Sequence, residues 1–104
     1  MDKTYQNALR KINCLRKACN RSPLELLPRG DLYSASDHPI VRALKCAGAW
    51  YVLHTVVWFV SQKAAKKAGK VWGIKSYENT VHLPKALVDY LKATDPKVFH
   101  SLSA

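Results

Sequence analysis

Apolar residues recur at three- and four-residue spacing near the start of the chain, which predicts an amphipathic helix over residues 2–20. The apolar stripe consists of Tyr5, Ala8, Leu9, Ile12, Leu15 and Cys19. Pro23 follows closely, and the residue before a proline disfavours helical geometry, so we expect this helix to end near Asn20. Residues 21–37 are punctuated by proline, glycine and serine, which is typical of a linker between two elements.

The segment 39–60 is the most apolar part of the chain. We expect it to form a central helix that is buried on most of its circumference. Asp37 is the expected cap of its N-terminus, with Pro39 in the first helical turn. His54 lies within the apolar run, so it is expected to be a hydrogen-bonded histidine of the core.

The same segment permits a different interpretation. Arg42, Lys45 and His54 interrupt the apolar run, so no stretch is long enough to span a bilayer. Val, Trp, Tyr and Phe are concentrated in its second half, which also fits two strands, at roughly 49–55 and 56–60. Periodicity does not separate helix from strand when both faces are apolar, so both alternatives stay open.

The remainder of the chain predicts three short elements. Residues 61–70 have strong helix propensity, and Gly69 is the expected residue just beyond the helix end. Residues 71–82 change to a strand-like composition on both sides of Glu78-Asn79, which predicts a β-hairpin. Residues 84–93 predict a last short helix, followed by a tail over residues 95–104.

These elements predict one compact domain over residues 1–104, because 104 residues leave no room for two ordinary domains. The predicted fold class is mainly α: a small helical bundle around the very apolar central helix, with a short hairpin near 71–82 attached. An α+β fold is the alternative.

Charge adds a prediction about partners. The chain has 17 Lys plus Arg and 7 Asp plus Glu, a formal net charge of +10. Every charged residue between Lys3 and Leu24, and every one between His38 and Tyr77, is basic. Two long acid-free segments predict a polyanion as partner, with DNA or RNA backbone phosphates as the main contacts.

The candidate binding residues come from three places along the chain. The first helix contributes Arg10 and Lys17, with Arg21 just beyond it. Lysines at i, i+3, i+4 and i+7 should share one side of the third predicted helix. These are Lys63, Lys66, Lys67 and Lys70. Lys75 adds a cation beyond them, and Trp72 and Tyr77 could stack on exposed bases or else pack in the core.

The sequence gives little support for a catalytic or metal-binding site. Asp37 and His38 are adjacent and would diverge, and no glycine-rich phosphate loop is present. The three cysteines lack paired zinc-ligand spacing, and their odd number favours free thiols in a reducing compartment. We therefore expect a non-enzymatic, soluble intracellular protein, of the cytoplasm, nucleoid or nucleus, without a cofactor.

Other functions fit the same basic surface. The chain could be a small regulator or inhibitor, as found in mobile genetic elements, whose basic face docks on an acidic protein surface or in a nucleic-acid-binding groove of a partner protein. A membrane-surface role for helix 2–20 is weakened by the absence of Trp and Phe on its apolar face. Gly73 and Lys75 disfavour a standard helix-turn-helix, and a helix followed by a basic hairpin, as in winged-helix proteins, fits slightly better.

Overall fold

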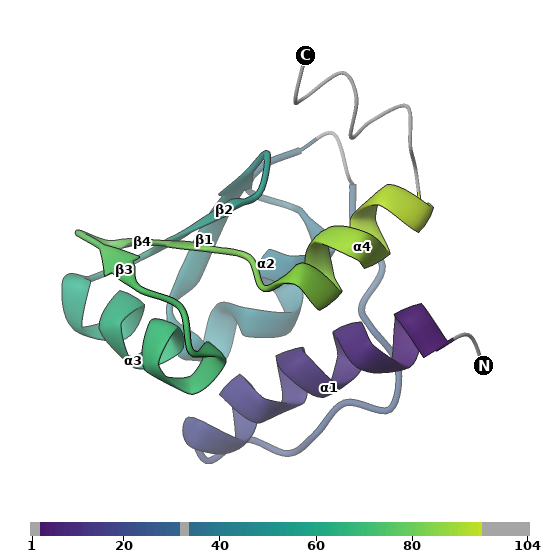
Figure 1. The fold of residues 1–104 in the computed structure, drawn as a ribbon, viewed down its shortest axis with the longest axis horizontal. Coiled ribbons are helices and arrows are strands. Elements are labelled where there is room, and N and C mark those ends of the chain that lie inside the picture. The colour runs from purple at the N-terminus through teal and green to yellow at the C-terminus, as the bar shows by residue number, and fades with distance from the viewer. Residues whose placement is uncertain (1–2, 32–33, 95–104) are drawn as a thin grey trace.

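The computed structural model describes residues 3–31 and 34–94, which form helices packed on one side of an antiparallel sheet (Figure 1). The elements in chain order are α1 (Lys3–Ala18), α2 (Pro39–Leu44), the short 3-10 helix η1 (Lys45–Ala47), β1 (Ala49–Leu53), β2 (Val56–Phe59), α3 (Gln62–Trp72), β3 (Ser76–Tyr77), β4 (Thr80–His82) and α4 (Lys85–Thr94). The fold class is therefore α+β, and the predicted mainly-α bundle is wrong.

The error lies in the segment 39–60. Only its beginning is helical, because α2 ends at Leu44 and η1 passes into Gly48, whose φ of +92° belongs to the left-handed region that glycine tolerates best. Residues 49–59 then form the strands β1 and β2, as the alternative interpretation held. Within the described residues, no helix is both long and apolar enough to cross a bilayer.

His54 is consequently not a core residue. It lies in the two-residue turn between β1 and β2, is exposed, and has a positive φ of 56°. A histidine at this position is compatible with the tight turn because a two-residue hairpin loop needs backbone geometry of this kind. The apolar residues on either side of His54 are strand residues that pair with each other.

The sheet has the order β1-β2-β4-β3, with antiparallel neighbours throughout. Val52 is paired with Val57, which is paired with Val81, and all three are buried. Paired residues project from the same side of a sheet, so this row defines the inner face. The helices lie on that side, below and to the right of the strands in Figure 1.

One hydrophobic core joins the inner face to the helices. Its largest fully buried side chains are Ile12, Leu15, Ile40, Leu44, Val57, Phe59, Val81 and Leu87. The predicted first helix is confirmed as α1, and it packs along α2, α3 and α4. Tyr5 of α1 meets Tyr90 of α4 edge to face, with ring centroids 5.8 Å apart.

The predicted linker is fastened to α1 over its first part. The side chain of Asn13 donates to the carbonyl of Leu24 at 3.0 Å and accepts from its N–H at 2.8 Å. The hydroxyl of Tyr5 accepts from the N–H of Leu27 at 2.7 Å. These bonds satisfy backbone groups that would otherwise lack partners beside the helix. The predicted tail, residues 95–104, lies outside the described residues.

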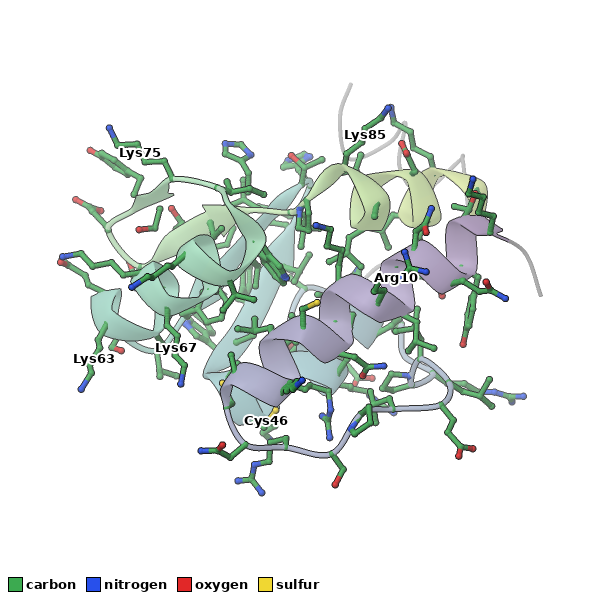
Figure 2. The ribbon with its side chains drawn as sticks, turned by 60° about the horizontal axis from the view of Figure 1, so that its bottom comes forward. Arg10, Cys46, Lys63, Lys67, Lys75 and Lys85 are labelled. Atoms are coloured by element: carbon green, nitrogen blue, oxygen red, sulfur yellow. The ribbon has the colours of Figure 1, made fainter. Side chains whose placement is uncertain are left out.

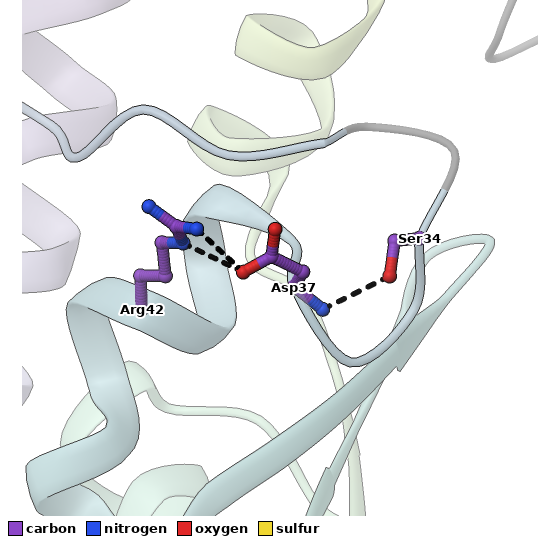
Figure 3. A network of polar contacts seen from close by, with 3 residues as sticks. All are labelled: Ser34, Asp37 and Arg42. Carbon is purple, nitrogen blue, oxygen red and sulfur yellow. Dashed lines mark hydrogen bonds and ion pairs between the residues drawn. The ribbon is translucent and has the colours of Figure 1, made fainter.

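The start of α2 depends on His38 rather than on Asp37. The Nδ1 atom of His38 accepts from the N–H of Ile40 at 3.1 Å, and Pro39 occupies the first helical turn. Asp37 instead pairs with Arg42 at 2.7 Å, while its own N–H donates to the hydroxyl of Ser34 (Figure 3). The predicted cap is therefore one residue too early.

Burial of His38 predicts a pH-dependent stability. Burial lowers its pKa from 6.5 to about 4, against a smaller opposing effect of the Asp31 carboxylate. The unfolded chain then binds the proton more readily than the folded chain, so stability is complete above pH 6.5 and falls as the pH drops toward 4. We expect this one group to remove up to about 3 kcal/mol from the free energy of unfolding across that range.

The test is urea unfolding of the wild type and His38→Asn at several pH values between 7 and 4. Asparagine keeps a capping acceptor but does not titrate. The variant should lose less stability than the wild type as the pH falls. Parallel stability curves for the two proteins would contradict the assignment.

Candidate nucleic-acid interface

Helix α3 is the element that positions most of the predicted cations. The hydroxyl of Ser61 caps it by accepting from the N–H of Ala64 at 3.1 Å. The helix runs on through Gly69, which was expected to lie beyond its end, and stops at Gly73 with a φ of +69°. Gly69 is needed inside the helix because a Cβ atom there would lie 2.4 Å from the carbonyl oxygen of Ile74.

The two sides of α3 differ sharply in polarity. Ala65, Ala68, Gly69 and Trp72 are buried against the sheet and α1. The predicted lysines are all exposed and share the opposite side: Lys63, Lys66, Lys67 and Lys70. We call these four residues the lysine row. Figure 2 shows Lys63 and Lys67 extending outward from this end of the molecule.

Charge within the lysine row is not neutralised by its own segment, since no acidic residue occurs between His38 and Tyr77. Neighbours three and four residues apart on a helix have Cβ atoms about 5–6 Å from each other. Four like charges at this spacing repel one another, at a cost of a few tenths of a kcal/mol per pair. An anion placed over the row would relieve that repulsion.

Lys75 and Tyr77 follow α3 and stay at the surface. Lys75 is exposed directly before β3, and Tyr77 is 75% exposed within it. In Figure 2, Lys75 lies at the same end of the molecule as Lys63. The structure therefore brings Lys75 to the end of the molecule where the lysine row begins, while Tyr77 belongs to the sheet.

Trp72 has a different place. It is only 6% exposed, and its indole N–H donates to the backbone carbonyl of Lys11 at 3.0 Å. This bond connects the last turn of α3 to the middle of α1. In this position the ring is part of the core and offers no face to a ligand.

The candidate cations of α1 form a second group. Arg10 and Lys17 are exposed and seven residues apart, so they share one side of the helix, and Arg21 is exposed just beyond it. Arg16 is used internally instead, donating to the carbonyls of Ser22 at 2.9 Å and Ala43 at 3.0 Å. Not every basic residue is therefore available to a partner.

The outer face of the sheet carries Tyr51 and Trp58, which the sequence pattern did not single out, in one row with the predicted Tyr77. Tyr51 is paired with Trp58, Trp58 with Thr80, and Thr80 with Tyr77. These four residues cross all four strands in one row, which we call the aromatic row. The sequence of β2 gives no periodic signal for this row, because apolar residues occupy both its half-buried and its buried positions.

The cysteines do not converge. Cys14, Cys19 and Cys46 are free, and the guanidinium of Arg16 lies 3.6 Å from the Sγ atom of Cys46. Across residues 3–31 and 34–94, no three His, Cys, Asp or Glu side chains come together as ligands for a metal ion.

Comparison of the chain with models of protein families, with curated proteins and with solved structures found no significant match.

Because Trp72 is buried, we expect its substitution to lower stability without changing the affinity for nucleic acid. Trp72→Phe removes the hydrogen bond from the indole N–H to the part-buried carbonyl of Lys11, which should cost about 0.5–1.5 kcal/mol of stability. A loss of 1 kcal/mol lowers the melting temperature of a domain this size by roughly 4–8 °C. Affinity for DNA or RNA, measured well below the melting temperature, should not change.

Tyr77→Phe is the matched control for stability, because an exposed hydroxyl normally contributes less than about 0.5 kcal/mol. A Trp72→Phe variant with normal melting and weakened binding would show that the ring acts at the interface.

Proposed function

We propose that this chain binds nucleic acid without catalysing a reaction on it, mainly through contacts between its exposed cations and backbone phosphates. The observation that carries the proposal is the lysine row. Four exposed lysines share one side of α3, within a segment that contains no acidic residue. The net charge of +10 supports the same class of partner.

Exposed lysines on one side of a helix suit contacts with phosphates. Lysines that neutralise phosphates release condensed counterions, and this release supplies much of the binding free energy at low salt. The buried side of α3 fixes the helix on the sheet, so the four ammonium groups extend from a rigid support. Arg42 shows the contrast, because its guanidinium is already paired with Asp37 at 2.7 Å.

Lys75 extends the proposed surface beyond the end of α3, and Arg10, Lys17 and Arg21 form a second group of cations on and beside α1. We propose the lysine row as the main contact, with the α1 group as a secondary one. Phosphate contacts of this kind position a nucleic acid and do not by themselves read its sequence.

The proposal predicts a measurable salt dependence. Four to six phosphate contacts give a slope of about −4 to −5 in a plot of log affinity against log salt concentration on duplex DNA. Changing Lys63, Lys66, Lys67 and Lys70 together to Gln should make this slope less negative by about 3 to 4. The affinity at moderate salt should fall tenfold or more, because four attractive charges are lost.

Glutamine keeps a similar length and helix propensity, so the folded variant should melt close to the wild type. The matched control changes Arg10, Lys17 and Arg21 to Gln, which removes three exposed cations from another part of the surface. This control should weaken binding less than the lysine-row variant does.

An unchanged slope and affinity in the lysine-row variant would remove α3 from the site. No binding of DNA or RNA at low salt would overturn the proposal altogether. That result would favour the alternative in which the basic surface docks on an acidic partner protein.

A further inference from the structure

The outer face of the sheet presents three aromatic rings in contact, with Tyr77 further along the same row beyond Thr80. Tyr51 and Trp58 meet edge to face with centroids 5.4 Å apart, and Trp50 lies 5.3 Å from Tyr51. The irregular pairing between Ala49 and Tyr51 places Trp50 in a bulge, and its N–H donates to the carbonyl of Phe59 at 3.1 Å. Bulges commonly re-aim a side chain in this way.

These rings are both fixed and accessible. Tyr51 and Trp58 are half-buried among their neighbours, which restrains their orientation, while Trp50 is 48% and Tyr77 75% exposed. Neighbouring strands lie about 4.7–4.9 Å apart, so the aromatic row spans roughly 14 Å from β1 to β3. This length accommodates two or three stacked or splayed bases of an extended strand.

We propose that the aromatic row stacks the bases of single-stranded nucleic acid, and that the chain therefore binds single strands more tightly than duplexes. This inference rests on the proposed function and specifies which form of nucleic acid the protein binds. Bases in a duplex are already stacked on each other, so they offer no free face to Tyr51, Trp58 or Tyr77. Unpaired bases do, and stacking on aromatic side chains tolerates any sequence.

Two cations lie next to strands of this sheet in the chain. Helix α3 begins three residues after β2 ends, so Lys63 in its first turn lies near the end of β2 that carries Trp58. Lys75 directly precedes β3 and its Tyr77. Figure 2 shows Lys63 and Lys75 at the same end of the molecule, Lys75 beside the strands and Lys63 extending from α3.

Glu78 is the opposing charge at this end. It is exposed in the turn between β3 and β4, next to Tyr77. Its carboxylate would repel a nearby phosphate, so Glu78→Gln should strengthen binding. A purely apolar protein partner fits the face less well, because Thr80 and the exposed His82 add polar groups to it.

The experiment compares fluorescence anisotropy of labelled ten-nucleotide oligo-dT with that of a ten-base-pair duplex, at one low salt concentration. Tyr77→Ala and Trp58→Leu should each weaken oligo-dT binding by about 5- to 150-fold, the range for one lost base–aromatic stack. Duplex affinity should change less than twofold. The lysine-row variant should weaken both ligands.

Matched variants distinguish the loss of an aromatic ring from the loss of the fold as the cause of weaker binding. Tyr77→Phe keeps the ring and should bind oligo-dT like the wild type, and Leu26→Ala changes an exposed apolar side chain of the loop beside α1 and should have no effect. Because Tyr77 is 75% exposed, its alanine variant should fold even if Trp58→Leu does not.

Equal affinity for oligo-dT and duplex, or oligo-dT binding that Tyr77→Ala leaves unchanged, would overturn the inference while the lysine-row result still supports the proposed function. Absence of binding to both ligands would overturn the proposed function itself. The two failures are therefore distinguishable in one set of titrations.

Discussion

The pairing of β2 between β1 and β4 is the interaction on which the rest of the structure depends. It places Val57 and Phe59 on the inner face, where the helices complete the core, and it leaves Trp58 on the other face. A shift of the register by one residue would exchange these positions and expose the core residues to water. Burial on one face therefore specifies which rings reach the surface on the other.

The same pairing also fixes the position of α3. The chain leaves β2 at Phe59, Ser61 starts the helix almost at once, and α3 packs on β2, β3 and β4. Its small buried residues allow close packing, and the bond from Trp72 to Lys11 connects its far end to α1. With this side of α3 packed in the core, the lysine row on its opposite side faces solvent.

Much of this architecture could be predicted from the sequence in the segments that follow a single helical or strand-like pattern. A stripe of apolar residues at helical spacing identified α1, strong helix propensity identified α3, and the change in composition after α3 identified the hairpin. The exposed side of α3 followed directly from the spacing of its lysines. Short elements with one polar and one apolar side leave little ambiguity.

Residues 49–59 could not be assigned in this way, because apolar and aromatic side chains occupy both faces of β1 and β2. Tertiary pairing with β4 favours the strand over the helix in this segment. The order of residue types along the chain does not contain that pairing. The aromatic row was missed for the same reason, since it exists only when the strands are side by side. Net charge likewise does not tell the exposed Lys63 from Arg42, which is paired with Asp37.

We propose two contacts with nucleic acid: phosphates against the lysine row of α3, and unpaired bases against the outer face of the sheet. The most direct measurement is a two-dimensional ¹H–¹⁵N NMR titration of the whole chain with oligo-dT at low salt, following the three tryptophan indole signals and the backbone amides. We expect the indole signals of Trp50 and Trp58 and the amides of α3, β3 and β4 to shift, while the indole signal of Trp72 stays unchanged. Shifts confined to α1 and α4, with the signals of Trp58 and the lysine row unchanged, would contradict it.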